Sequence, residues 1–200
     1  MTALPGTEVS VAGLRRRSPL LRAVVSGTGI VALLYIILYA LYAFWQPSAL
    51  SVFTFTDLVN NSTPLALAAA GETLVVISRG FDLSVAGVVS LTNVLMAVYP
   101  LQGPGGALVS LLMCCAIGAL VGGINGVLVS RLGLQTIAAT LGTMIICQGL
   151  SLVILDAPGG TIADFVTYSL TDTLFGVIPI AGLFLVAAVI LWLALRRTDF

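Results

Sequence analysis

Three charged residues interrupt an otherwise apolar stretch, Gly71–Ser90, and they are the residues best placed to do chemistry. They are Glu72, Arg79 and Asp82. A charge inside a bilayer costs roughly 2.5 to 3.5 kcal/mol on insertion scales, so it normally faces the protein interior or a water-filled cavity and marks a solute or ion pathway. A purely structural alternative is an internal pair of Glu72 with Arg79, because these positions lie about two turns apart on one helix face.

The composition indicates that these charges belong to a membrane protein. Hydrophobic residues make up 59% of the 200 residues and charged residues only 8%. A soluble chain of this length could not bury so much apolar surface. The net charge is zero, which argues against a nucleic-acid-binding footprint.

The residue types also argue against an enzyme. The chain contains no His, and its eight basic residues are all arginines. A Ser-His-Asp or Cys-His arrangement is therefore impossible, and the Lys of a phosphate-binding loop is missing. The cysteines, Cys114, Cys115 and Cys147, lie within apolar runs, where small packing residues are expected. We expect no catalytic, cofactor-binding or metal-binding site.

Apolar runs separated by polar turns predict an all-α, polytopic membrane protein of about six transmembrane helices. The runs are 23–45, 64–78, 83–99, 107–129, 132–155 and 177–195. The second run is too short for a hydrocarbon core of roughly 30 Å, so either its helix begins nearer Leu58 or this span is short or broken. We expect residues 1–22 to be a cytoplasmic segment and 23–200 to form the transmembrane domain.

Helix-boundary signals flank the charged stretch. Thr63 can cap a helix whose first position is Pro64, and Gly80 is a plausible C-terminal glycine. Asp82 or Ser84 can then cap the next helix.

Glycines recur every fourth residue in the fourth run, at Gly118, Gly122 and Gly126. This row leaves one helix face bare enough for a neighbouring backbone to approach, which predicts a packing face.

The distribution of charge predicts the orientation. With six crossings and a cytoplasmic N-terminus, every basic residue falls on the cytoplasmic side or at its boundary, as the positive-inside rule requires. These residues are Arg15, Arg16, Arg17, Arg22, Arg79, Arg131, Arg196 and Arg197. The other side carries acidic residues and no basic ones, namely Asp57, Asp156, Asp164 and Asp172, the last three in a polar loop over 156–176. We therefore expect a multi-pass inner-membrane protein with both termini in the cytoplasm.

Two motifs carry a family resemblance. GETLVVISRGFDLSV at 71–85 and GGINGVLVSRLGLQTIAATLGTMIICQGL at 122–150 occur in order, and RRTDF ends the chain at 196–200. Together they resemble the permease subunits of bacterial ABC importers for sugars, of the ribose, xylose and galactose type. The resemblance covers roughly residues 57–200. Because that family is longer, the chain is similar to its N-terminal portion and the transmembrane domain is incomplete relative to the family.

The chain departs from the family pattern at four positions. Phe81 stands for a usual isoleucine, Arg79 for a usual glycine and Gln148 for a usual arginine, while Ala86 interrupts a common SVG. Changes at Phe81 and Gln148 could alter the solute or the coupling without changing the fold.

The resemblance implies a permease component of an ATP-driven importer that receives a monosaccharide or similar small polar solute from a periplasmic binding protein. The implied partners are ATP-binding cassette ATPase subunits, that periplasmic solute-binding protein, a second permease subunit of the same or another kind, and membrane lipid. Three alternatives stay open: a branched-chain amino-acid type permease, an ion-coupled secondary transporter, and a truncated fragment that transports nothing.

A path for a hydroxyl-rich solute needs a few hydrogen-bonding groups in an apolar wall, few enough for the solute to leave again. The candidates within or at the ends of the spans are Glu72, Thr73, Asn93, Asn125, Thr140, Thr143 and Gln148. Candidates for the cytoplasmic boundary or coupling are Arg79 and Asp82. Each has a structural alternative: Asn93 and Asn125 can bond between helices, and Asp82 can serve as a helix cap.

Overall fold

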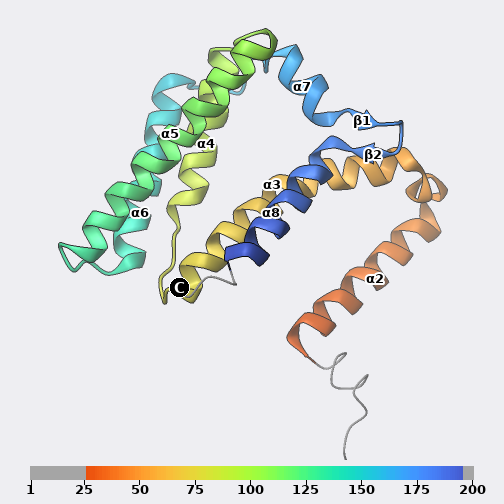
Figure 1. The fold of residues 1–200 in the computed structure, drawn as a ribbon, viewed down its shortest axis with the longest axis horizontal. Helices are drawn as coiled ribbons and strands as arrows, with labels where there is room; N and C mark the ends of the chain where they lie inside the picture. Colours follow the sequence, from red (N-terminus) through yellow and green to blue (C-terminus); the bar gives the residue numbers. More distant parts are fainter. Residues whose placement is uncertain (1–25, 196–200) are drawn as a thin grey trace, which may run out of the picture. The chain divides into compact units, whose positions relative to one another are not determined.

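The computed structural model describes residues 26–195, and this part of the chain divides into two compact units between Ser51 and Val52. Apart from one short hairpin, the regular structure of the described chain is helical (Figure 1), which confirms the predicted all-α class. Six arginines that were predicted to lie on the cytoplasmic side fall outside the described residues, namely Arg15, Arg16, Arg17, Arg22, Arg196 and Arg197.

The first unit contains α2 (Gly27–Trp45) and the short 3-10 helix η1 (Pro47–Leu50). Ser26 caps α2, because its Oγ accepts a hydrogen bond from the Gly29 N–H at 3.1 Å. Tyr39 Oη donates to the carbonyl of Ala49 at 2.8 Å, which ties η1 back onto α2. No residue of α2 is buried, as expected for an apolar helix that faces lipid. The helix predicted over 23–45 is thus confirmed from Gly27 onward.

The second unit begins with α3 (Val52–Ile77), which is longer than the sequence suggested. The predicted start at Thr63 and Pro64 is wrong, because the helix runs straight through the proline. Pro64 removes one backbone N–H, and the hydroxyl of the buried Thr63 donates to the Val59 carbonyl at 2.7 Å one turn earlier. Packing against α8 favours the continuous helix. The alternative of an earlier start therefore holds, and the start lies upstream of Leu58.

Three helices form the tightest part of the second unit: α4 (Ser84–Val98), α5 (Gly103–Ser130) and α6 (Thr136–Ile154). Leu91, Val121 and Cys147 form its small buried core, with one residue from each helix. Gly87 brings α4 directly onto α6, because a Cβ at this position would lie 2.7 Å from the Met144 carbonyl oxygen.

The predicted glycine packing face finds no partner in the described chain. A Cβ added at Gly118, Gly122 or Gly126 would meet no atom of residues 26–195 within 4 Å. The close approach that a glycine allows is made by Gly87 instead, which belongs to no glycine row. The α5 row therefore packs against no helix of residues 26–195, and the packing face stays a prediction.

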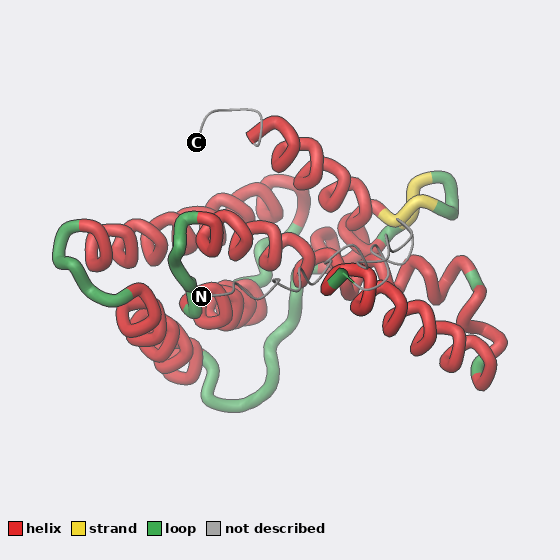
Figure 2. Tube along the Cα trace, turned by 90° about the horizontal axis from the view of Figure 1, so that it is seen from below, coloured by secondary structure: helices red, strands yellow, loops and turns green. Residues whose placement is uncertain are grey.

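The loop predicted over 156–176 contains regular structure that the sequence analysis missed. It contains α7 (Asp164–Thr171) and β1 (Thr173–Leu174), which pairs antiparallel with β2 (Ile178–Pro179) in a hairpin drawn in yellow in Figure 2. Because β2 lies within the run predicted as a helix over 177–195, that predicted start is wrong. Phe175 and Gly176 at the tip of the hairpin have positive φ values of 56° and 72°, and the Val177 N–H donates to the Leu174 carbonyl at 3.3 Å. After the hairpin, α8 (Ile180–Leu195) packs along α3.

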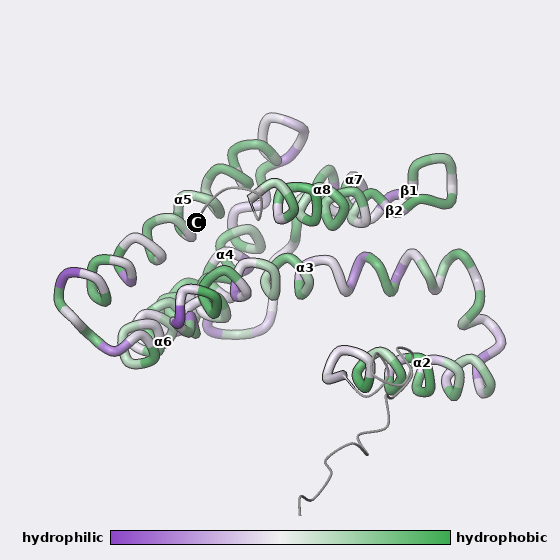
Figure 3. The backbone as a smooth tube through the Cα atoms, turned by 60° about the horizontal axis from the view of Figure 1, so that its bottom comes forward, coloured by the Kyte–Doolittle hydropathy of each residue, from purple (hydrophilic) through white to green (hydrophobic). Residues whose placement is uncertain are grey.

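Several of these helices suit a membrane. Within residues 26–195, α2, α5 and α6 are long and apolar enough to cross one, and 84–98 and 180–194 are shorter apolar helices. Figure 3 shows hydrophilic residues along the first part of α3 and a nearly uniform hydrophobic α8. A polytopic, helical membrane protein is thereby confirmed. The count of six crossings stays a prediction, because α3 is more polar than the others.

Candidate functional site

The end of α3 is a Schellman turn with an arginine in the position that glycine normally takes. The Gly80 N–H donates to the Val75 carbonyl at 3.0 Å, and the Arg79 N–H donates to the Val76 carbonyl at 2.9 Å. Arg79 has a φ of 62°, in the left-handed region that costs a residue with a Cβ roughly 1 to 2 kcal/mol. The predicted terminator Gly80 is therefore one residue too late, since Arg79 makes the turn and Gly80 follows it, buried.

This turn reverses the chain so that the next residues come back to α3. One carboxylate oxygen of Glu72, Oε1, accepts a hydrogen bond from the Asp82 N–H at 3.1 Å. Glu72 is half-buried, whereas Arg79 is exposed. Among the described residues, Glu72 and Arg79 form no ion pair, although the sequence allowed one. Glu72 instead stabilises the chain reversal through its bond to the Asp82 N–H.

Asp82 connects the reversal to the start of α4. Its Oδ1 accepts from the Ser84 backbone N–H at 2.8 Å and from the Ser84 hydroxyl at 2.5 Å. The first bond satisfies the backbone donor of the first residue of α4. The N-cap position itself is taken by Leu83, which makes no side-chain cap bond, so Asp82 supports the helix start from one residue further out.

Ser84 continues the connection into α5 and α6. Asn125 Nδ2 donates to Ser84 Oγ at 2.9 Å, and Thr143 Oγ1 donates to Asn125 Oδ1 at 2.9 Å. Ser84 is 2% exposed and Asn125 is 5% exposed. We call Glu72, Asp82, Ser84, Asn125 and Thr143 the polar network; it links four helices.

Thr140 lies beside the polar network on α6. Its hydroxyl is 2.9 Å from the Thr136 carbonyl oxygen and 3.3 Å from the Phe81 carbonyl oxygen. The second contact joins α6 to the reversal between α3 and α4. Phe81, the residue that replaces a usual isoleucine, thus meets α6 through its backbone, while its side chain is 54% exposed.

The structure brings together four of the seven predicted path residues and leaves three apart. Glu72, Asn125 and Thr143 belong to the polar network and Thr140 lies against it. Thr73 is exposed and its hydroxyl donates to the Ala69 carbonyl of its own helix at 2.7 Å. Asn93 and Gln148 are exposed and lie outside the network.

Sequence reasoning missed Ser84 as a member of the site. It was considered only as a helix cap, although a serine two residues after an aspartate can bond both to that carboxylate and to a third group. Its second partner, Asn125, is 41 positions away, and only packing of α4 on α5 brings the two together.

The polar network places hydrogen-bond acceptors within a bundle of mostly apolar helices. Each internal donor has a partner, which a buried polar group needs in order not to destabilise the fold. A carboxylate offers two oxygens. Glu72 and Asp82 use Oε1 and Oδ1 here, so each keeps a second oxygen that could accept a hydrogen bond from a solute.

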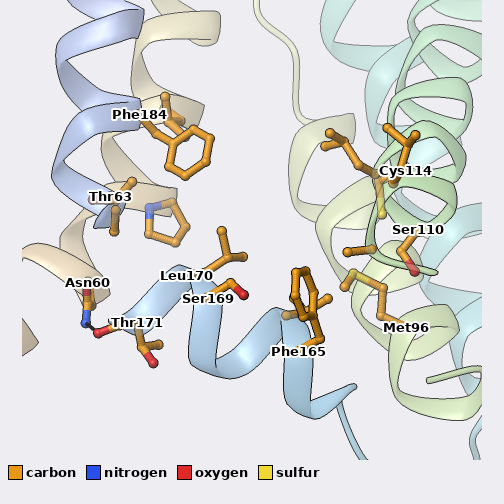
Figure 4. Close-up of a pocket in the computed structure, with 17 residues that line it drawn as sticks. Asn60, Thr63, Met96, Ser110, Cys114, Phe165, Ser169, Leu170, Thr171 and Phe184 are labelled. Carbon is orange, nitrogen blue, oxygen red and sulfur yellow. Dashed lines mark hydrogen bonds between the residues drawn. The ribbon is translucent and has the colours of Figure 1, made fainter. Parts of the chain in front are cut away.

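A separate apolar pocket of about 640 Å³ lies between α3, α7 and α8 on one side and α4 and α5 on the other (Figure 4). Most of its wall is aliphatic or aromatic, with Leu67, Met96 and Phe184 as examples. None of the predicted path residues lines it. It therefore suits an apolar occupant better than a polar solute.

Comparison with known proteins agrees with this arrangement of apolar helices and polar side chains. Residues 54–200 match the family described as "Branched-chain amino acid transport system / permease component". The chain belongs to this family of membrane permeases. The family resemblance to importer permeases is thereby confirmed, and the chain is a multi-pass inner-membrane protein.

Among curated relatives, the chain is similar to the "Autoinducer 2 import system permease protein LsrC" of several Yersinia species. The identity is 34% over 176 residues for the Yersinia enterocolitica protein, covering 87% of this chain and 48% of the relative. It is 32% over 176 residues for a Yersinia pestis protein, covering 87% and 49%. The chain spans about half the length of the curated relatives it matches. No solved structure matches it.

Proposed function

We propose that this chain forms the N-terminal part of the permease component of an ATP-driven importer for a small, neutral, polar solute. The observation that carries the proposal is the polar network, which holds two carboxylates among apolar helices by hydrogen bonds alone. Charged groups kept at such a place mark a solute pathway. Glu72 and Asp82, with Asn125, Thr140 and Thr143 behind them, are the groups that would line or gate it.

The charges near the network favour a neutral solute over an amino acid. A zwitterion would need a cation to pair with its carboxylate, and Arg79 is the basic residue nearest to Glu72 along the chain. Arg79 is exposed and makes no ion pair within residues 26–195. The remaining acceptor oxygens of Glu72 and Asp82 suit hydroxyl donors, as in a monosaccharide.

The branched-chain amino-acid alternative is kept because the family description names that substrate. The relatives named for autoinducer 2 import show that the family also includes other import systems. Uptake of a labelled monosaccharide series and of leucine into cells that express the complete importer would separate the two. Uptake of leucine alone would overturn the neutral-solute proposal.

The proposed partners are a pair of ATP-binding cassette ATPase subunits, a periplasmic solute-binding protein and a second permease subunit. Two contacts support the proposed orientation. The turn after α3 and the turn after α5 lie at one end of the second unit, because Gly80 and Phe81 approach Thr136 and Thr140. These turns hold Arg79 and Arg131, as the positive-inside rule expects of one cytoplasmic face. Asp57 and Asp172 line one pocket at the start of α3 and are proposed to face outward.

The direct test is co-purification of the tagged 200-residue chain with the ATPase subunits of the same importer. Recovery of the ATPase from detergent supports a permease that couples through this part, whereas its absence supports the alternative of a fragment that transports nothing. A second test measures solute uptake by the complete importer in cells whose ATPase subunits are inactive. Loss of uptake there rules out the ion-coupled alternative. Uptake that persists and follows an ion gradient would overturn the ATP-driven proposal.

A further inference from the structure

A second pocket, of about 540 Å³, lies at the start of α3. One wall is a single face of α3, because the residues that form it fall at 52 and 53, 56 and 57, and 60 and 61. The other wall is the chain between α7 and the hairpin. We call this the acceptor pocket. Its nearest α3 residue is about three turns from Glu72, roughly 16 Å along the helix, so it is distinct from the polar network.

The free hydrogen-bonding groups of the acceptor pocket are mostly acceptors. Within residues 26–195 the Asp57 carboxylate has no hydrogen-bond or ion-pair partner, and Asp172 uses Oδ1 to accept from the Thr173 N–H at 2.7 Å. Two further oxygens on pocket-lining residues, Thr56 Oγ1 and Asn60 Oδ1, are buried without a partner in the described chain. Buried polar oxygens of this kind are rare in folded proteins.

Each side-chain amide of the pocket already donates one hydrogen bond. Asn60 Nδ2 donates to the Thr171 carbonyl at 3.2 Å, which closes α3 onto α7, and Asn61 Nδ2 donates to the Asp57 carbonyl at 2.9 Å. Among residues 26–195, no basic residue lines the pocket. Most of the free groups are acceptors, which suits a ligand that supplies donors, and the Thr56 hydroxyl can both donate and accept, as can the hydroxyl groups of a ligand.

Two features favour a hydroxyl-rich molecule over a metal ion. Phe53 lines the pocket and is 81% exposed, so an aromatic face stands beside the carboxylates. Such a face suits the apolar C–H side of a ring that carries hydroxyls, and the volume suits a whole small molecule. Among the described residues, no group of three His, Cys, Asp or Glu side chains could hold a metal ion.

We propose that the acceptor pocket is a binding site for a neutral, hydroxyl-rich small solute, which it receives before the solute reaches the polar network. The proposal rests on the proposed function, since a permease for such a solute needs a place where the solute enters. Phe53 supports the ring face, and Asp57 and Asp172 accept from its hydroxyls.

The test uses the purified full chain in detergent micelles, with D-ribose and D-xylose as probes and saturation-transfer NMR as the readout. We expect a transfer signal from the native chain that is lost in Asp57→Ala and in Phe53→Ala. The matched control is Asp156→Ala, an exposed acidic residue outside the pocket, which should keep the signal. Thermal unfolding midpoints equal to the native value show that each variant is folded.

Three outcomes would overturn the proposal. One is an equal signal in the native chain and both pocket variants; another is a signal lost in Glu72→Gln but kept in Asp57→Ala, which places the solute at the polar network. Absence of any sugar signal together with Ca²⁺ binding that Asp57→Ala removes would also overturn it. Co-purification with the ATPase does not depend on this pocket, so failure here is distinguishable from failure of the proposed function.

Discussion

Asn125 and Ser84 lie on different helices and form a buried hydrogen bond of 2.9 Å, from Asn125 Nδ2 to Ser84 Oγ. The other end of the Asn125 amide accepts from Thr143 Oγ1 at the same distance. One side chain therefore fastens α5 to α4 and to α6 at once. Because most residues of these three helices are apolar, this asparagine is one of the few groups that fix which parts of them face one another.

Replacing Asn125 by alanine should lower stability by about 0.5 to 2 kcal/mol, the range measured for hydrogen bonds between membrane helices. The loss leaves Ser84 without its donor and Thr143 without its side-chain acceptor. Thermal unfolding of the purified chain in detergent measures the change. Asn93→Ala is the matched control, since Asn93 is exposed and outside the polar network. Equal stability of both variants would show that the interhelical bonds contribute nothing.

Replacing Arg79 by glycine should stabilise the chain by roughly 1 kcal/mol. The φ of 62° at this position is strained for arginine and unstrained for glycine. Arg131→Gly is the control, because Arg131 has an ordinary φ of −101° and gains nothing from the change. A lower unfolding temperature for Arg79→Gly than for the native chain would contradict the assignment of the Schellman turn.

Replacing Gly87 by alanine should destabilise the chain by about 1 to 3 kcal/mol, as expected for an extra methyl group in a tight helix contact. The new Cβ would stand 2.7 Å from the Met144 carbonyl oxygen, so α4 and α6 must separate. Gly118→Ala provides the comparison, because its Cβ would meet nothing within 4 Å of the described chain. Unfolding temperatures of the two variants decide the point, and a larger loss for Gly118→Ala would contradict it.

Replacing Glu72 by glutamine in the complete importer should reduce solute uptake more than replacing Arg131 by glutamine. The amide oxygen can still accept from the Asp82 N–H, so the chain reversal persists while the charge disappears. Arg131 lies in the turn after α5. In our proposal it contributes only to the orientation of the chain in the membrane. Initial uptake rates at equal amounts of protein in the membrane provide the measurement. An equal or reversed effect would remove Glu72 from the path.

Much of the candidate site could be predicted because a charge in an apolar run is conspicuous in any fold. Glu72 and Asp82 are such charges, and Asn125 and Thr143 are polar groups in long apolar runs. The sequence could not distinguish them from Asn93 and Gln148, which have the same character in similar runs. The difference is the direction in which each side chain points, and neighbouring helices decide it.

Helix limits were predicted less well for a related reason. The start assigned to Thr63 and Pro64 relied on local capping preferences, and these yielded to the contact of α3 with α8 along its length. The hairpin at Thr173–Pro179 was missed because a pair of two-residue strands has almost no periodic signal of its own.

The sequence by itself determined that the chain is helical and resides in a membrane, because the composition leaves no other place for its apolar surface. It also determined which few charges had to be accommodated there. Only the tertiary structure decided that Glu72 bonds to the Asp82 backbone, that it forms no ion pair with Arg79, and that Ser84 joins Asn125. The reason is physical: solvation of apolar groups depends on composition, whereas a hydrogen bond depends on bringing two distant atoms within about 3 Å.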